Sequence, residues 1–573
     1  MLVAMAITLL ILVAVARAFA FVGERVRDSR GKLELSGDLR DITTRLSDEL
    51  SRCTVSLAPN TGGPDQAGYF LYYEGPCTDA TSSIFGSTQV IEGTTVANDS
   101  RYGDLDDYLA FTAVATPGSW FTGQVPRFVL EGTGTDTQPV VVRSRYAEII
   151  YFANPERDAS NAVIDADSNG IPDRLLLYRR VLLIRPDLNL ATNGGVFNIS
   201  AGANSRTGMS DVHQVCDLSV RRRLDSEGTP TNVVVANSLA DLSKPHNRFG
   251  HFRVPDSFLG VTDSMGTSIP GTSMPILALD EPLDIISSAP TTLRPADAAS
   301  STAPVVLEHR FSGFLGHEFV LNGDRQGEDV IANTCRGFDI RIFDRTARHI
   351  LTSNGLIVGP SDVAYREALA EPTTVDLQGG GFVDLCYPVL AGGSMRGWGA
   401  TNVAASASTG NPGNAVIPAS AQTLVQSEFS GLEFTGVFPT AASQKTYSES
   451  LVKSGRVLLS GTQVLLFQPA YDTYTSSYET DGFLQHRRLL GSQFRGSYWQ
   501  ELSGTTLADI DLGADGIDNL SPSFVDQPGV DDNAERETSA PFTTTAQSVK
   551  ISIRLENQGS RQLRQSSVVH TQQ

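Results

Sequence analysis

Residues 1–22 read MLVAMAITLLILVAVARAFAFV, a run with one charged side chain, Arg17. A helix of about 20 apolar residues is long enough to cross the hydrocarbon core of a bilayer. A dozen Leu, Ile, Val and Phe residues in the run each favour insertion by about 0.3–0.6 kcal/mol, whereas an arginine at mid-membrane costs about 2.5–3.5 kcal/mol. We therefore predict a transmembrane helix over residues 1–22, anchored by the side chains of Leu2, Ile7, Leu9, Leu10, Ile11, Leu12, Phe19 and Phe21.

The helical pattern continues beyond the apolar run without a proline. Apolar residues recur there at intervals of three and four with charged residues between them, which is the pattern of an amphipathic helix. These apolar residues are Leu35, Leu39, Ile42, Leu46 and Leu50. The sequence predicts one long helix, with residues 1–22 in lipid and residues 23–52 packed on a folded domain.

A cleavable signal peptide is the alternative interpretation of this segment. Ala16, Arg17 and Ala18 satisfy the small-x-small rule for cleavage. Two features argue against cleavage: no basic segment precedes the apolar run, and an arginine occupies the middle of the cleavage site.

The body of the chain has the pattern of a β-rich protein. Short runs of β-branched or aromatic residues, bounded by Gly, Pro, Asp and Asn, predict strands at 69–73, 148–152 and 175–184. Near the end, apolar and polar residues alternate over 549–555, and the turn signal NQGS at 557–560 leads into a second run at 563–569. Because two-residue alternation buries one face of a strand, this segment predicts a hairpin with one buried face.

The predicted fold class is α+β, with a long N-terminal helix packed on an antiparallel β-sheet and large insertions rich in strands and loops. Residues 399–423 are low in charged and aromatic residues and are typical of a flexible connector. The predicted segments are the transmembrane helix 1–22, its amphipathic continuation 23–52, a β region 53–190, an insertion or second β subdomain 191–430, and a C-terminal β region with the closing hairpin 431–573.

Composition limits the partners. The formal net charge of −20 argues against nucleic acid, because binding to phosphates needs a basic face. The five cysteines form no CxxC pair and show no zinc-ligand spacing. A bridge between Cys53 and Cys77 would contribute about 3–4 kcal/mol in the loop-entropy model, and unpaired thiols are an equally good interpretation.

An acidic loop at 165–173 (DADSNGIPD) matches the first nine positions of a calcium-binding loop. Carboxylate and amide oxygens fall at positions 1, 3 and 5, a glycine at 6, a backbone carbonyl at 7 and an acid at 9. The candidate ligands are Asp165, Asp167, Asn169, Ile171 and Asp173. The twelfth position is Leu176 rather than glutamate, and a plain hairpin turn is the competing interpretation.

A second acidic stretch near the C-terminal end is a weaker calcium candidate. Clustered carboxylates repel one another unless a cation or solvent lies between them. The candidate ligands there are Asp515, Asp518, Asp531 and Asp532, and a solvated acidic loop is the alternative. Apart from Ca²⁺ the sequence indicates no cofactor.

Motifs for catalysis are missing. His317-Glu318 has no second histidine at HExxH spacing, Ser394 lies in GGSMRG rather than in a nucleophile elbow, and no phosphate-binding or dinucleotide motif occurs. We therefore expect a protein without enzymatic activity.

Residues 2–10 (LVAMAITLL), followed by an apolar stretch and an amphipathic helix, resemble the N-terminal segment of type IV pilins and type II secretion pseudopilins. The tyrosine-rich strands, the strand LYRRVLLIRP at 177–186 and the closing hairpin are similar to those of minor pseudopilins of the general secretion pathway protein J type. In that family a prepilin peptidase removes a basic leader ending in Gly, the new N-terminal Phe is methylated, and a nearby Glu pairs with a neighbouring subunit. This chain begins beyond the position of that Glu, so either the translation start is placed too late or the protein is a variant that is processed differently.

The resemblance implies a minor pseudopilin-like structural component of a type II secretion or type IV pilus-like assembly. It implies a single-pass protein of the bacterial inner membrane, with the C-terminal domain in the periplasm or on the cell surface. Other pilins or pseudopilins would bind through the N-terminal helix, and calcium would stabilise the C-terminal region. A pilus-tip adhesin or surface-binding module is the first alternative, and a secreted periplasmic enzyme released after Ala18 is the second.

Overall fold

A computed structural model describes about half of the chain, in separate stretches. These are residues 2–57, 67–73, 103–105, 107–158, 163–164, 174–190, 194–198, 209–224, 230–243, 247–254, 274–277, 315, 319–321, 323–345, 347–360, 375–377, 379–384, 415–418, 457–460, 463–466, 470–473 and 546–571.

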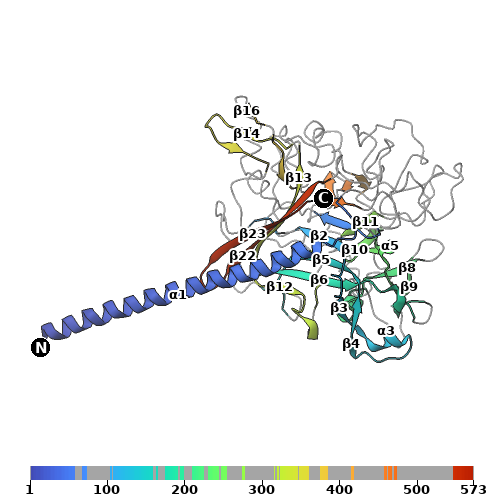
Figure 1. The fold of residues 1–573 in the computed structure, drawn as a ribbon, viewed down its shortest axis with the longest axis horizontal. Helices are drawn as coiled ribbons and strands as arrows, with labels where there is room; N and C mark the ends of the chain where they lie inside the picture. The colour runs from blue at the N-terminus through green and yellow to red at the C-terminus, as the bar shows by residue number, and fades with distance from the viewer. Residues whose placement is uncertain are drawn as a thin grey trace.

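A single helix, α1 (Leu2–Leu50), runs out of the folded body (Figure 1). Its 49 residues correspond to about 74 Å at 1.5 Å per residue. The predicted continuous helix is confirmed, although it ends at Leu50 and residues 51–52 form a turn in which Ser51 N–H donates to Ser47 O at 3.0 Å. All five residues predicted for its packing face are buried, with exposed fractions of 6% or less: Leu35, Leu39, Ile42, Leu46 and Leu50.

The central sheet has six strands, and every described pairing in it is antiparallel. Three of its strands confirm the predicted strands at 69–73, 148–152 and 175–184. Nearly every residue of the strand Tyr146–Pro155 is buried, which shows that both faces of the sheet are covered at its centre. The order is β12 (Val330–Ala332), β6 (Leu175–Leu183), β5 (Tyr146–Pro155), β2 (Tyr108–Val114), β1 (Phe70–Tyr73) and β21 (Ala470–Asp472).

A four-stranded antiparallel sheet contains the predicted C-terminal hairpin. Strands β22 (Ser548–Asn557) and β23 (Gln562–Thr571) pair in continuous register from Ser548 opposite Thr571 to Asn557 opposite Gln562. Val549, Ile551, Ile553 and Leu555 are buried, so the predicted hairpin and its buried face are confirmed. The full order is β17 (Gly381–Val383), β13 (Cys335–Asp344), β22 and β23.

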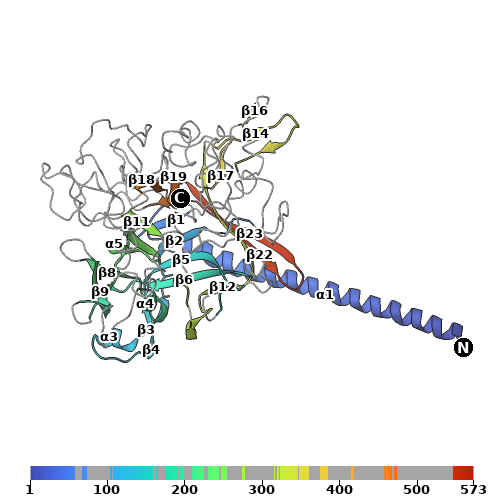
Figure 2. The same cartoon turned by 180° about the vertical axis from the view of Figure 1, so that it is seen from behind.

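The packing half of α1 and both sheets share one hydrophobic core. The helix lies against β22 and β23, so segments from the two ends of the chain are side by side in both views (Figures 1 and 2). The hairpin thereby helps to cover the apolar face that the helix presents.

A second, smaller core lies in a lobe beside the central sheet, and Leu183 of β6 belongs to this core. It draws on residues both before and after position 190, including Val125, Phe128, Leu188 and Val234. Its elements are β3 (Phe121–Pro126), α3 (Arg127–Glu131), β4 (Pro139–Ser144), η1 (Pro186–Leu188), β7 (Phe197–Asn198), α4 (Met209–Val215), β8 (Val220–Leu224) and β9 (Pro230–Ala236).

The remaining elements are short. A finger of three strands projects from the body (Figure 1) and consists of β14 (Ile350–Leu351), β15 (Ile357–Val358) and β16 (Val375–Asp376). The others are α5 (Leu239–Leu242), β10 (His251–Val254), β11 (Met274–Leu277), η4 (Gly323–Arg325), β18 (Ala415–Pro418), β19 (Val457–Ser460) and β20 (Gln463–Leu466).

Candidate membrane anchor and assembly surface

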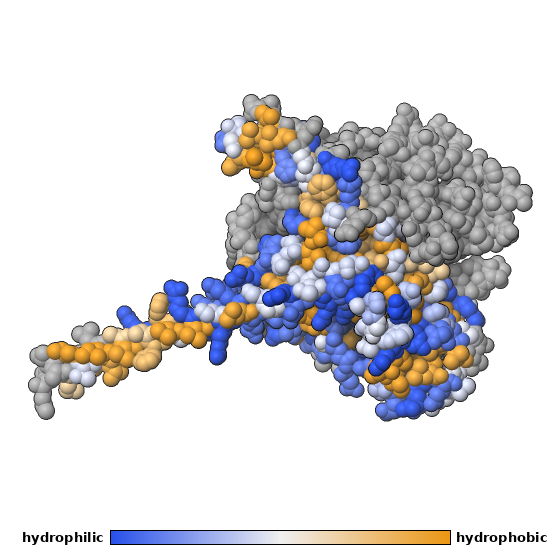
Figure 3. Space-filling model, viewed as in Figure 1, coloured by the Kyte–Doolittle hydropathy of each residue, from blue (hydrophilic) through white to orange (hydrophobic). Residues whose placement is uncertain are grey.

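The N-terminal half of α1 is an exposed apolar rod (Figure 3). It is long and apolar enough to cross a membrane, and none of its most apolar stretch is buried against the body. The predicted anchor residues Ile7, Leu9, Ile11, Leu12, Phe19 and Phe21 are each more than half exposed. Leu2 and Leu10 lie in the helix, and the positions of their side chains are outside what the structure describes.

An apolar stripe continues along the back of the helix after the apolar run ends. Successive helical residues are rotated by about 100°, which puts Phe19, Val22, Val26 and Leu33 within about 60° of one another and roughly opposite the packing face. All four are exposed, and Leu33 is the most exposed at 76%. We call these four residues the back stripe. Their intervals of three, four and seven residues are those of a helix that packs on another helix.

The turn of the C-terminal hairpin rests on the helix at Gly31. A Cβ atom at Gly31 would lie 2.8 Å from Ser560 Oγ and 3.0 Å from Asn557 Cγ, so a larger residue at this position would force the side chains of the turn to shift. Asn557 Nδ2 also donates to Glu34 Oε2 at 3.4 Å, and Asn557 Oδ1 accepts from Ser560 N–H at 3.0 Å. This contact fixes the hairpin turn about one helical turn before the first buried leucine of the helix, Leu35.

A buried carboxylate holds the other end of the helix. Glu49 is only 3% exposed and accepts from Tyr151 Oη at 2.6 Å and from Arg179 Nε at 3.2 Å, while Arg179 Nη2 forms a second close contact with it. Burial lowers the pKa of Arg179, but its bonds with Glu49 outweigh this effect and the net change in pKa is upward. Burial and the charge of Glu49 raise the pKa of Tyr151. The helix end is thus attached to β5 and β6 by a charged, hydrogen-bonded group.

A polar network joins the second lobe to the central sheet. Buried Glu148 accepts from Tyr69 Oη at 2.5 Å, from Ser219 Oγ at 2.6 Å and from Phe249 N–H at 3.0 Å. Burial raises its pKa against the opposing effect of these hydrogen bonds. Asn237 Nδ2 in turn donates to Ser219 Oγ at 3.0 Å.

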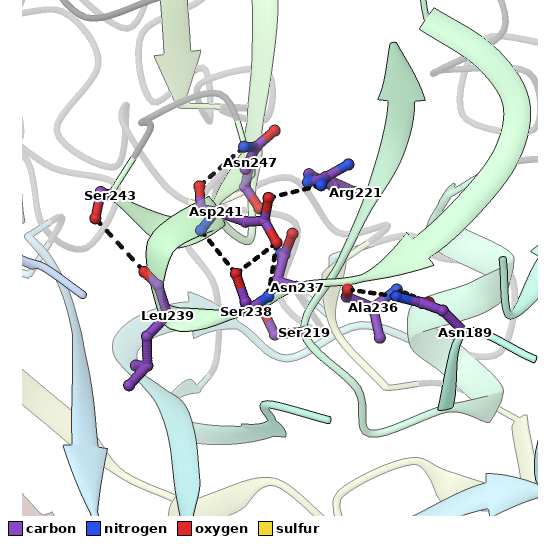
Figure 4. A network of polar contacts seen from close by, with 10 residues as sticks. All are labelled: Asn189, Ser219, Arg221, Ala236, Asn237, Ser238, Leu239, Asp241, Ser243 and Asn247. Carbon is purple, nitrogen blue, oxygen red and sulfur yellow. Dashed lines mark hydrogen bonds and ion pairs between the residues drawn. The ribbon is translucent and has the colours of Figure 1, made fainter. Parts of the chain in front are cut away.

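Figure 4 shows how this network extends into the lobe. Ser238 caps α5, because its Oγ accepts from Asp241 N–H at 3.1 Å and the Asp241 carboxylate accepts from Ser238 N–H at 2.8 Å. Arg221 Nη2 lies 2.6 Å from Asp241 Oδ1. Because these side chains bond to one another and to the backbone, the arrangement stabilises the junction of the lobe and the sheet.

Arg180 is the centre of a second buried cluster. Its Nη2 donates to His213 O at 3.0 Å, and its Nη1 lies 3.5 Å from Asp329 Oδ2. Burial, together with the positive charge of Arg180, lowers the pKa of His213 to about 3, so this histidine is neutral at physiological pH. The His213 ring packs edge-on against Phe249 at 4.8 Å between ring centroids. These contacts are typical of a structural cluster.

The calcium candidates lie outside the described residues. Residues 165–173 connect β5 to β6, and their flanks are tied together because Ile164 N–H donates to Glu156 O and Glu156 N–H donates to Arg174 O, each at 3.0 Å. Asp515, Asp518, Asp531 and Asp532 are in a stretch that the structure does not describe. Among the residues that are described, no three His, Cys, Asp or Glu side chains are grouped to hold a metal ion. Cys53 is a free thiol, and Cys77 is outside the described residues.

The sequence did not predict the hydrogen bonds of Glu49 with Tyr151 and Arg179, or the contact of the hairpin turn with Gly31. Glu49 follows Leu46 by three residues and therefore falls on the packing face, so a charged residue in an apolar stripe was the available signal. Gly31 gave no signal of its own, because its partner turn is more than 500 residues away in the chain.

The fold and this surface define an α+β protein with a projecting apolar helix and a folded body. No protein-family model, curated protein or solved structure matches the chain.

Proposed function

We propose that this protein is a membrane-anchored, minor pseudopilin-like component of a type II secretion or type IV pilus-like assembly. Its N-terminal helix is anchored in the bacterial inner membrane and its folded body lies in the periplasm or on the cell surface. The protein acts by assembly and contact, without covalent chemistry. The observation that carries the proposal is the back stripe of α1.

Lipid alone does not account for the back stripe. Val26 and Leu33 lie about 6 Å and 16 Å along the helix axis beyond Val22, the last residue of the apolar run. The headgroup layer on each side of a bilayer is only about 5–8 Å thick, so Leu33 lies beyond it. An apolar seam with this spacing, on the side away from the body, fits the helix of a second anchored subunit.

Replacing Leu33 by glutamate tests the proposal. A charge buried in a helix–helix seam weakens association by more than about tenfold. We therefore expect L33E to remain in membranes, to fold, and to lose copurification with other pilin-like subunits after membrane solubilisation.

The matched control is S36E, which adds the same charge to an exposed position of the same helix outside the stripe. Ser36 Oγ donates to Lys32 O at 2.7 Å, an interaction within the helix. Equal copurification of L33E, S36E and the unchanged protein would refute the assembly role of the stripe.

Calcium binding by Asp165, Asp167, Asn169, Ile171 and Asp173 remains part of the proposal, with the C-terminal acidic stretch as a weaker site. Isothermal titration of the full chain with Ca²⁺, compared with D165N/D167N, tests the first loop. Equal heats for the two proteins would remove that loop from the proposal.

A surface-binding role is the second candidate function, favoured by the finger β14–β16. Leu356, Ile357, Val375 and Leu377 are between 41% and 64% exposed, and they form an apolar end on a projecting element (Figure 3). If the protein is a pseudopilin-like component, deleting its gene should block the export of secreted proteins. If it is an adhesin, the deletion should reduce only the attachment of cells to surfaces.

A further inference from the structure

Basic residues gather where the helix leaves the predicted bilayer. Four lie on α1 just after the apolar run. One lies in the turn of the C-terminal hairpin and one near the start of β23, and all six side chains are exposed. We call this set the basic collar: Arg25, Arg27, Arg30, Lys32, Arg561 and Arg564.

The contact at Gly31 brings the two parts of the collar together. Gly31 is about 13 Å along the helix axis from Val22. With about 5–8 Å of that distance occupied by headgroups, the hairpin turn lies within about one Debye length of them, which is about 8 Å at physiological ionic strength. Arg561, with its φ of 51°, stands in this turn.

The charge of the collar opposes that of the whole chain. Segments 23–34 and 557–564 contain six basic residues and three acidic ones, Glu24, Asp28 and Glu34, in a chain of formal net charge −20. Within the part of the chain that the structure describes, no carboxylate forms an ion pair with any of the six collar residues. The Arg25 guanidinium lies 5.1 Å from the ring centroid of Phe21, at the membrane end of the collar.

We propose that the basic collar binds the anionic phospholipid headgroups of the membrane that anchors α1. Basic residues beside a membrane helix are each attracted to anionic lipid by about 1 kcal/mol, or about fivefold in affinity. This proposal rests on the proposed membrane anchoring of α1. It adds the lipid phosphate group as a ligand of the protein. Binding of the collar holds the hairpin turn against the membrane surface and so determines the orientation of the folded body relative to the bilayer.

Hydrogen exchange of the full chain in vesicles tests this proposal. The protein is reconstituted in phosphatidylcholine vesicles with and without phosphatidylglycerol, and exchange is followed in peptides that cover 557–564. Phosphatidylglycerol should slow exchange there by roughly five- to thirty-fold, as expected for the two hairpin arginines. About 1 M salt should abolish the difference, because it shortens the Debye length to about 3 Å.

The double variant R561E/R564E should lose the lipid dependence. The matched control is R143E/R145E, which reverses two exposed arginines at the junction of β4 and β5 in place of Arg561 in the hairpin turn and Arg564 in β23. Unchanged exchange in β22 shows that the hairpin is still folded. An acidic protein partner instead of lipid would leave exchange in 557–564 equal in both kinds of vesicle and would overturn the proposal.

Vesicle flotation separates the two proposals. If the chain does not float with vesicles of either composition, the membrane anchor itself is refuted. If it floats with both and exchange in 557–564 does not depend on phosphatidylglycerol, only the collar is refuted.

Discussion

Single residues fix α1 to the body at both ends of its packing half. Tyr151 and Arg179 form hydrogen bonds with Glu49, and the turn that contains Ser560 packs directly against Gly31. The packing leucines between these points could be predicted because their spacing is local in the sequence. The partners of Glu49 and Gly31 could not, since they are supplied by strands whose pairing is not local.

At the same scale, His213 predicts a pH dependence of stability. Its pKa in the folded protein is about 3, whereas an unfolded histidine has a pKa of about 6.5. Between these values the unfolded state binds more protons, so the free energy of unfolding should fall as the pH decreases from about 6.5 to about 3, with a slope approaching 1.4 kcal/mol per pH unit.

The variant H213F isolates this contribution, because phenylalanine can keep the contacts with Phe249 and cannot titrate. The measured quantity is the difference in unfolding free energy between the two proteins at several pH values. A difference that stays constant between pH 4 and pH 7 would contradict the assignment.

Among the elements, the helix and the hairpin were the easiest to predict. The hairpin shows two-residue alternation and a turn signal, and these local features determine its register. Strand β13 is harder to predict, because it lies within the segment 191–430, which is predicted to be an insertion or a second β subdomain. Its alternation of Phe338, Ile340 and Ile342 with polar residues is visible in the sequence, but nothing there shows that it pairs with β22.

Because the hairpin contacts the helix at Gly31, replacement of a glycine by leucine should change the free energy of unfolding differently at Gly31 and at Gly37. G31L would drive a side chain into the turn and should lower the free energy of unfolding by about 1–3 kcal/mol. G37L is the control, because a Cβ atom at Gly37 would have no other atom within 4 Å. Leucine there should stabilise the helix slightly, by up to about 1 kcal/mol.

Limited proteolysis and denaturant unfolding of both variants measure these effects. Cleavage within 546–571 should become faster only in G31L. Equal stability of the two variants would show that the hairpin turn does not rest on Gly31.

In the whole molecule, the exposed half of α1 is separate from the core that stabilises the body. Among the described residues of the helix, Gly31 is the first that is buried, and the hydrophobic core begins at Leu35. The α+β class and the long helix could be predicted from composition and periodicity. The second core could not, because it combines short segments from both sides of residue 190 that show no common pattern.

Deleting residues 2–24 should therefore release a folded body. We expect the shortened protein to dissolve without detergent and to unfold within about 2–4 °C of the full chain, equivalent to less than about 1 kcal/mol. It should no longer float with vesicles. Aggregation of the shortened protein, or a much lower unfolding temperature, would show that the N-terminal half of α1 contributes to the core.

Because α1 packs against β22 and β23, the helix is synthesised long before the strands that help to cover it. The apolar face at Leu35–Leu50 leaves the ribosome about 500 residues before the hairpin that helps to cover it, a delay of roughly 25–100 s at 5–20 residues per second. During that interval the apolar face is incompletely covered. A nascent chain of this kind is exposed to proteases and to premature association with other helices, so a chaperone or the membrane surface would have to shield it until its last strands arrive.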